Sequence, residues 1–143
     1  DSLFVIARAE GQTIGVSSGV PLIREPDEVQ AAFREAGIPP EQVFYFGESV
    51  LLPQWRGHGI GVRFFQEREG YARSLPGIRL AAFCAVDRPE HHPLRPPEWM
   101  PLDRFWTHRG FTRTALQTSF TWQETGEPAP SPKSLTFWTK PLV

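Results

Sequence analysis

The chain has 143 residues, with 15 Lys or Arg against 16 Asp or Glu, and a formal net charge of −1 at pH 7. This length suits one domain with a sizeable core, and the near-neutral charge argues against nucleic acid or an anionic membrane as the main partner. A single cysteine excludes an intrachain disulfide framework, and only four histidines accompany it, so we expect no structural metal. With no apolar run of membrane-spanning length and no signal peptide, a cytoplasmic location is expected.

The first part of the chain predicts a hairpin followed by a helix. Leu3–Ala9 is apolar and predicts a strand, which returns through Thr13–Val20 after a glycine-containing turn. Apolar residues at helical spacing then predict a helix over Pro26–Ala36. Because the chain starts directly on a strand and without an initiator methionine, we expect residues 1–143 to be a single domain that is incomplete at its N-terminus.

The central part predicts a β–α–β unit. Val43–Leu52 is β-branched and aromatic, as is typical of a central strand, and Gly47 within it indicates a bulge. Gly61–Leu75 carries one apolar face and predicts an amphipathic helix. Arg79–Val86 reads as a second buried strand. The two strands should therefore be parallel neighbours joined by a right-handed crossover.

The C-terminal part begins with a loop. Pro89–Pro101 holds five prolines, which favour an extended, stiff segment over a helix. A short helix is expected over Leu102–Arg109. Apolar and polar residues alternate along two segments, Thr118–Gln123 and Ser134–Lys140, which predicts two strands. The proline-rich loop 126–132 separates them, so we expect a closing antiparallel pair.

The turn between the central strand and its helix, Arg56–Gly61, is the most informative segment. Glycines at 57, 59 and 61 remove every Cβ from one side, so backbone N–H groups can approach an anion at the positive end of the helix dipole. Arg56 adds a permanent cation. Such a turn suits the pyrophosphate of a cofactor. It is neither a P-loop nor a dinucleotide fingerprint, because Val62-Arg63 follows it. The alternative is a glycine-rich turn that only lets a helix pack close to a sheet.

The spacing Arg-x-x-Gly-x-Gly, with Pro53 three residues upstream of the arginine, resembles the acetyl-CoA-binding motif of the GCN5-related N-acetyltransferases (GNAT superfamily). The resemblance covers roughly Leu3 to Lys140 and includes the Arg109-Gly110-Phe111 ending of the short helix. It implies an α/β fold with a mixed central sheet, a splayed parallel strand pair and flanking helices. The family's first strand and first two helices have no counterpart here.

The resemblance also implies a function, namely transfer of an acetyl group from acetyl-CoA to a small-molecule or peptide amine by direct attack in a ternary complex. A homodimer would be compatible with it. The pantetheine arm would lie between the splayed strands as a pseudo-strand. The residues implied in acetyl-CoA binding are Val50, Leu51, Leu52, Arg56, Gly57, His58, Gly59, Ile60, Gly61 and Trp106.

Trp106 stands where many family members carry a tyrosine that protonates the departing thiolate. An indole N–H is too weak an acid for this task, although CoA thiolate is a tolerable leaving group near neutral pH. The substitution also favours an alternative from another class, a non-catalytic acyl-CoA-binding module that senses or scaffolds within a larger protein.

Candidate catalytic residues are few. Glu48, a carboxylate on an apolar strand, could deprotonate the amine if it is buried; otherwise it would pair with a surface arginine. Tyr45 is a weak candidate for the missing acid, and His92 could act as a base. Cys84 reads as an inert core thiol. In the proline-rich loop, the residues expected to contact the acceptor are His91, Arg95 and Trp99, although loop histidines are more often simply solvated.

Overall fold

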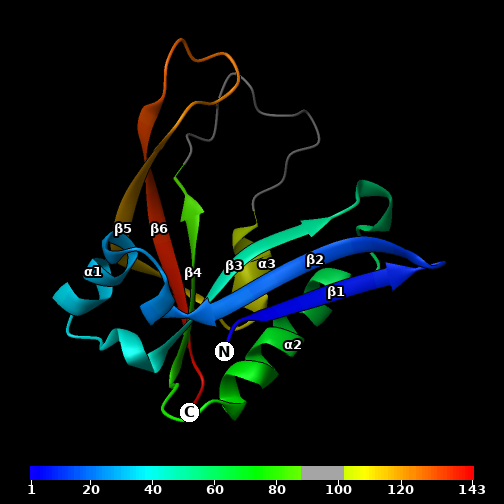
Figure 1. Ribbon diagram of the computed structural model, residues 1–143, viewed down its shortest axis with the longest axis horizontal. Helices are drawn as coiled ribbons and strands as arrows, with labels where there is room; N and C mark the ends of the chain where they lie inside the picture. Colours follow the sequence, from blue (N-terminus) through cyan, green and yellow to red (C-terminus); the bar gives the residue numbers. More distant parts are fainter. Residues whose placement is uncertain (88–101) are drawn as a thin grey trace.

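The computed structural model describes residues 1–87 and 102–143 (Figure 1). Its six strands are β1 (Leu3–Ala9), β2 (Gln12–Pro21), β3 (Val43–Leu51), β4 (Leu80–Val86), β5 (Thr112–Trp122) and β6 (Ser131–Pro141). Its α-helices are α1 (Asp27–Glu35), α2 (Ile60–Ser74) and α3 (Asp103–His108), with short 3-10 turns at η1 (Leu22–Arg24), η2 (Pro40–Gln42) and η3 (Pro53–Trp55). No helix in these two ranges is long and apolar enough to cross a membrane.

All six strands form one mixed sheet in the order β1-β2-β3-β4-β6-β5. Only β3 and β4 are parallel, and every other neighbouring pair is antiparallel. The α/β class, the mixed sheet and the parallel pair at its centre were all predicted from the sequence, and the structure confirms them.

The parallel pair separates soon after it forms. β3 and β4 are in register only over Val43–Tyr45 and Leu80–Ala82. Beyond that point β3 runs to the right in Figure 1 while β4 points upward, and α3 lies behind the opening between them. The predicted splay is therefore present, and the sheet consists of two arms, β1–β3 and β4–β6, that meet at three residue pairs.

A bulge lies in β3 just after this contact. Ser17 pairs with Ser49 and Gly19 with Phe46, so that two residues of β3, Gly47 and Glu48, oppose the single residue Ser18 of β2. A Cβ at Gly47 would lie 2.6 Å from Ser18 Oγ, which explains why this position is a glycine. The predicted bulge at Gly47 is confirmed.

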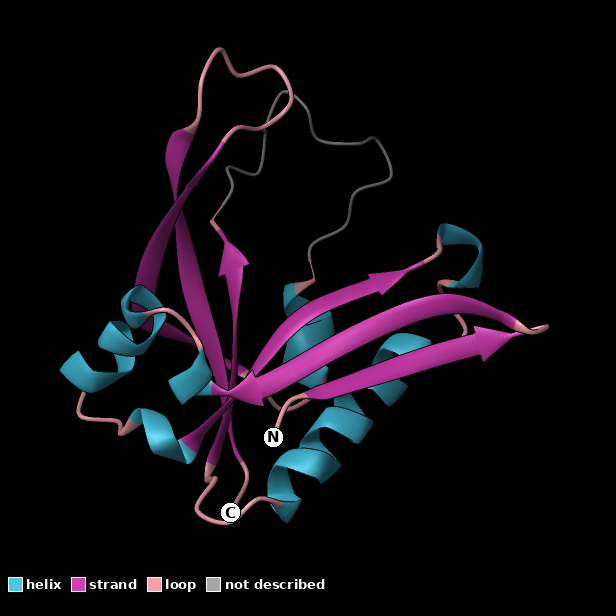
Figure 2. Ribbon diagram, in the orientation of Figure 1, coloured by secondary structure: helices cyan, strands magenta, loops and turns pink. Residues whose placement is uncertain are grey.

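Each face of the sheet carries its own core cluster, one beneath α2 and one beneath α1. Figure 2 shows these helices against the strands. Alternate β3 side chains divide between the two clusters, so that Phe44 and Phe46 pack on the α2 side while Val43 and Tyr45 pack on the α1 side. On the α2 side a continuous cluster of aromatic rings links the two arms. The ring of Phe46 in β3 lies 5.6 Å from that of Phe65 in α2, which lies 6.0 Å from that of Phe83 in β4.

The C-terminal hairpin is longer than the sequence indicated. β5 begins at Thr112, six residues before the predicted start at Thr118. This first stretch is polar and irregular, and its register against β6 shifts between Arg113 and Gln117. The side chain of Thr114 bridges the irregularity by donating to Phe137 O at 2.7 Å and accepting from Leu116 N at 3.1 Å. Alternation of apolar and polar residues could not reveal a strand held together in this way.

Candidate functional site

The turn that leads from β3 into α2 has the geometry of an anion cradle. Gly57 and Gly59 have positive φ values of 79° and 83°, a region that other L-residues rarely adopt. Gly59 is the N-cap of α2, and no side chain caps the helix. The first N–H groups of α2 therefore remain available to a ligand at the positive end of the helix dipole.

His58 braces this turn through its ring. Its Nδ1 lies 3.0 Å from Arg56 O and 3.1 Å from Trp55 O. Both partners are carbonyl oxygens, so Nδ1 must carry the hydrogen and Nε2 is left as the acceptor in the neutral ring. His58 is among the residues that we predicted to bind acetyl-CoA. That role stays a prediction, and the ring has a structural task of its own.

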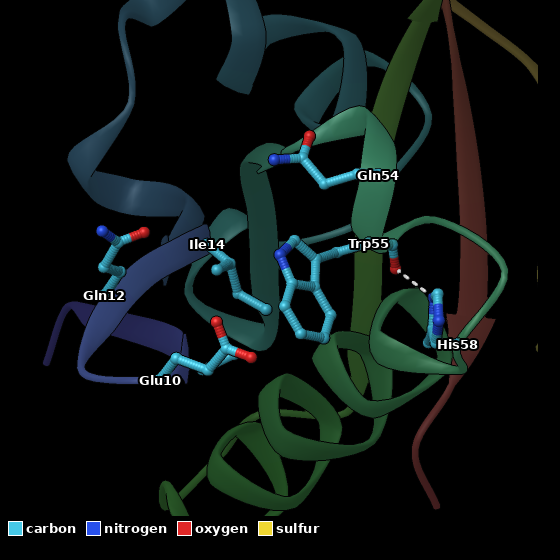
Figure 3. Close-up of a pocket in the computed structure, with 7 residues that line it drawn as sticks. Glu10, Gln12, Ile14, Gln54, Trp55 and His58 are labelled. Atoms are coloured by element: carbon cyan, nitrogen blue, oxygen red, sulfur yellow. Dashed lines mark hydrogen bonds between the residues drawn. The ribbon is translucent and has the colours of Figure 1, made fainter.

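A cavity of about 360 Å³ lies on the hairpin side of the turn (Figure 3). The indole of Trp55 stands at its centre in this view, with Ile14 on one side and His58 on the other. Glu10 and Gln12 of the β1–β2 hairpin close the opposite wall. The cavity thus lies beside the turn, and it shares no described lining residue with a second cavity between β3 and β4.

The second cavity, of about 280 Å³, lies at the opening between the splayed strands. It is bounded by β3 and α2 on one side and by β4 and α3 on the other. Its lining residues are Phe46, Gly47, Ser49, Gly61, Phe64, Phe65, Arg68, Phe83, Cys84, Leu102, Phe105 and Trp106. Gly61, the last glycine of the turn, and Trp106 of α3 both belong to it, so the anion cradle continues into a largely apolar cleft.

The end of β3 presents alternate backbone groups to its open edge, the edge that faces away from β2. Leu52 N donates to Ile14 O of β2 at 2.9 Å, and Val50 pairs with Val16 of the same strand. Leu51 lies between them, so its N–H and C=O point to the opposite edge, which no strand of the described chain covers. Of the three residues predicted here, Leu51 therefore has the backbone orientation that a pseudo-strand ligand would need.

Trp106 is held in the cleft wall by aromatic neighbours. The centroid of its ring lies 4.9 Å from the ring centroid of Phe83 and 5.2 Å from that of Trp138. Its backbone carbonyl accepts from Phe111 N at 3.1 Å, next to Gly110, where the chain leaves α3 with a φ of 93°. The residue at this position can line a ligand's path but supplies no acidic proton.

Glu48 is exposed, which corrects the expectation of a buried carboxylate. The splay is the reason, since β3 pairs with β4 only as far as Tyr45 and the four residues 47–50 are all exposed. The N–H of Glu48 donates to Ser18 Oγ at 3.0 Å. No Lys or Arg within residues 1–87 and 102–143 forms an ion pair with Glu48, so the alternative pairing with a surface arginine is not found there either.

Tyr45 and Cys84 face each other across the parallel pair, on the α1 side of the sheet. The Tyr45 hydroxyl lies 2.9 Å from Cys84 Sγ. Burial, followed by the charge and hydrogen bond of Cys84, raises the pKa of Tyr45 well above its usual range. Burial also raises the pKa of Cys84, so its thiol stays protonated and unreactive at neutral pH. A raised pKa makes Tyr45 a weaker proton donor than an ordinary tyrosine.

The Tyr45 shift predicts a pH dependence of stability. Because the folded protein binds the phenolic proton more tightly than the unfolded chain, the free energy of unfolding should be insensitive to this group below about pH 10 and should fall as pH rises above it. Unfolding by urea at several alkaline pH values measures this slope. Tyr45→Phe should flatten it, whereas an equal slope in that variant would mean that another group is responsible.

The remaining predicted residues, His91, His92, Arg95 and Trp99, lie outside the described residues. One residue that we did not single out, Arg68, lines the cleft and is buried. The available signal was an arginine on the otherwise apolar face of the predicted helix. Among the described residues, no group of three or more His, Cys, Asp or Glu side chains could hold a metal ion.

Neither a protein-family model nor a curated protein matches the sequence, whereas solved structures match the fold. An acetyltransferase of the GNAT family from Streptococcus pneumoniae has a TM-score of 0.61 and 11% identity, covering 98% of this chain and 67% of that one. The structure of aminoglycoside 6′-N-acetyltransferase complexed with coenzyme A has a TM-score of 0.60 and 12% identity. The match covers 99% of this chain and 73% of that one.

Ribosomal-protein-alanine N-acetyltransferase from Brucella melitensis has a TM-score of 0.60 and 16% identity, covering 96% of this chain and 67% of that one. At such identities the likeness concerns the fold, and it extends over nearly the whole of this chain. Together with the mixed sheet, the splayed parallel pair and the glycine turn at the start of α2, it shows that the chain has the fold of the GCN5-related N-acetyltransferases.

Proposed function

We propose that this protein binds acetyl-CoA and transfers its acetyl group to an amine by direct attack in a ternary complex. The observation that carries the proposal is the continuity between the anion cradle and the cleft. The uncapped N-terminus of α2 begins at Gly59, and Gly61 in its first turn already lines the opening between β3 and β4. A ligand with a pyrophosphate at one end and an extended amide-bearing arm at the other matches this shape.

Each part of the cofactor has a counterpart in the proposal. The pyrophosphate would bind at the backbone of residues 56–61, with Arg56 as a cation beside it. The pantetheine amides would pair with the open edge of β3 at Leu51, and the thioester would lie near the bulge at Gly47. Trp106 would flank the arm from α3. These assignments rest on geometry and on the likeness of fold.

The acceptor is proposed to be a small molecule or a peptide with a free amine. Solved structures of similar fold include an aminoglycoside acetyltransferase and a ribosomal-protein-alanine acetyltransferase, which supports both kinds of amine. We keep His91, His92, Arg95 and Trp99 as proposed acceptor-side residues. A single domain, a cytoplasmic location and a homodimer are part of the same proposal.

Two measurements test the function directly. Calorimetry should detect CoA and acetyl-CoA binding, and release of free CoA thiol should accompany incubation of acetyl-CoA with a panel of amines and peptide N-termini. CoA binding with no turnover on any amine would favour the alternative, a non-catalytic acyl-CoA-binding module, for which Trp106 in place of an acid is the specific observation. Absence of CoA binding would contradict both.

Glu48 is proposed to assist deprotonation of the acceptor, directly or through water, because it lies at the bulge between Gly47 and Ser49, which both line the cleft. Glu48→Gln should lower turnover on the order of tenfold or more near neutral pH, with recovery as pH approaches the amine pKa of about 10, where free amine becomes abundant. The pH–rate profile measures this. Glu41→Gln, an exposed carboxylate just before β3, is the control and should match wild type. A profile of unchanged shape in Glu48→Gln would rule out the role.

A further inference from the structure

Arg68 is a buried cation that the proposed binding of acetyl-CoA does not use. It lies on the sheet-facing side of α2 and is only 2% exposed. Its guanidinium carbon is 4.4 Å from the ring centroid of Phe46 and 4.9 Å from that of Phe65. Burial lowers its pKa to about 10, against the opposing effect of Glu69, so the side chain is still charged at neutral pH.

No carboxylate in residues 1–87 or 102–143 pairs with this charge. Glu69, its neighbour in sequence, binds Lys140 at 2.6 Å and Arg73 at 3.7 Å instead. Arg68 donates from Nε to Phe64 O at 3.3 Å and from a terminal nitrogen to Ser18 O at 3.2 Å. These two bonds use two of the five N–H donors of a guanidinium. A buried charge that has no counter-ion among the described residues is costly, and a ligand would supply the missing negative charge.

The place where that charge would appear is the cleft. Arg68 lines it together with Gly47 at the bulge and Trp106 on the opposite wall. Of the described lining residues, Arg68 alone is charged; the others are apolar except Ser49 and the protonated thiol of Cys84. In such surroundings a fixed cation acts on a nearby anion far more strongly than it would in water.

We propose that Arg68 stabilises the negative charge that develops on the CoA sulfur as the acetyl group leaves, in place of the proton donor that Trp106 cannot be. The inference rests on the proposed acetyl transfer. In that step the amine nitrogen forms a bond to the carbonyl carbon, the C–S bond breaks, and its electron pair stays on sulfur. The proton of the amine leaves through Glu48 or water. The thiolate is then held by the guanidinium charge until solvent protonates it.

The ionisation of bound CoA tests this without an acceptor. Thiolate absorbs in the ultraviolet, so titrating the CoA complex against the unliganded protein, which contributes Cys84 and Tyr45, reports the pKa of the bound thiol. We expect it to lie about one to two units below the pKa of free CoA thiol, titrated in the same buffer. Glu48 at the bulge and Glu69 behind Arg68 would act in the opposite direction.

Arg68→Met should abolish the shift in the pKa of the bound thiol. Arg68→Gln is a second variant in case the first fails to fold, because it keeps a donor for Ser18 O but removes the charge. Arg73→Met removes a half-exposed cation from the end of the same helix and should leave the shift unchanged. In turnover, Arg68→Gln should be impaired far more with acetyl-CoA than with an acetyl thioester of an acidic aryl thiol, which needs no stabilisation of its leaving group.

A bound thiol that titrates as in water, or one whose shift survives in Arg68→Gln, would overturn the inference and leave Arg68 as a support for the Ser18 carbonyl. That result would not affect the proposed function, since CoA would still bind and turn over. Failure of CoA to bind in calorimetry would instead overturn the proposed function and this inference with it.

Discussion

Gly59→Val should reduce CoA affinity on the order of a hundredfold. A valine at this N-cap would place methyl groups where the pyrophosphate is expected and would hold the first N–H groups of α2 away from it. Losing one or two charge-assisted hydrogen bonds, at about 1.5–3 kcal/mol each, corresponds to an effect of this size. Calorimetric titration with CoA measures it.

The same substitution also strains the backbone, because Gly59 has a φ of 83°, and a control must separate strain from lost contact. Gly77 provides one. It lies beyond the other end of α2 with a φ of 82°, and at both positions a Cβ would meet no atom within 4 Å. Gly77→Val should therefore cost similar stability while CoA affinity stays at the wild-type value. Equal affinity losses in the two variants would show that the turn is not the binding site.

Lys140→Met should lower the free energy of unfolding by about 2–4 kcal/mol, because it leaves a buried carboxylate without its main partner. Lys140 Nζ lies 2.6 Å from Glu69 Oε1, whose side chain is 8% exposed, and 2.9 Å from Arg109 O at the end of α3. The lysine thereby joins β6 to both helices that flank the cleft. Urea unfolding of the variant measures the loss.

Arg34→Met is the matched control. The ion pair between Arg34 and Asp27 has the same length, 2.6 Å, but its side chains are 44% and 83% exposed, so its removal should cost less than about 1 kcal/mol. Adding Glu69→Leu to Lys140→Met should recover much of the stability, since an apolar pair leaves no buried charge. If Lys140→Met and Arg34→Met lower the free energy of unfolding equally, then burial does not make the Lys140–Glu69 pair more stabilising than an exposed one.

The elements that the sequence predicted best are those whose pattern is local. The first strand was predicted with both of its ends correct, Leu3 and Ala9. The bulge at Gly47 was predicted from a glycine inside a strand. The turn at residues 56–61 combined glycines, a cation and a helix start within one short segment. In each case neighbours in sequence carry the whole signal.

What the sequence could not supply depends on contacts between distant segments. Tyr45 and Cys84 are 39 residues apart, and their hydrogen bond exists only because β3 and β4 are adjacent. The exposure of Glu48 depends on where β3 separates from β4. Arg68 falls on the apolar face of the predicted helix, but its burial and its bond to Ser18 of β2 required the fold.

The three residue pairs that join β3 to β4 also bear on the mechanics of the molecule. In most sheets, a ladder of backbone bonds transmits force from one edge to the other. Here that ladder is interrupted, and continuity depends on the aromatic rings beneath the opening and on the Lys140–Glu69 ion pair. A ligand that bonded to both open edges would replace the absent rungs. The two arms would then resist shear as a single unit, and the proposed ligand, acetyl-CoA, would act as a removable strand of the sheet.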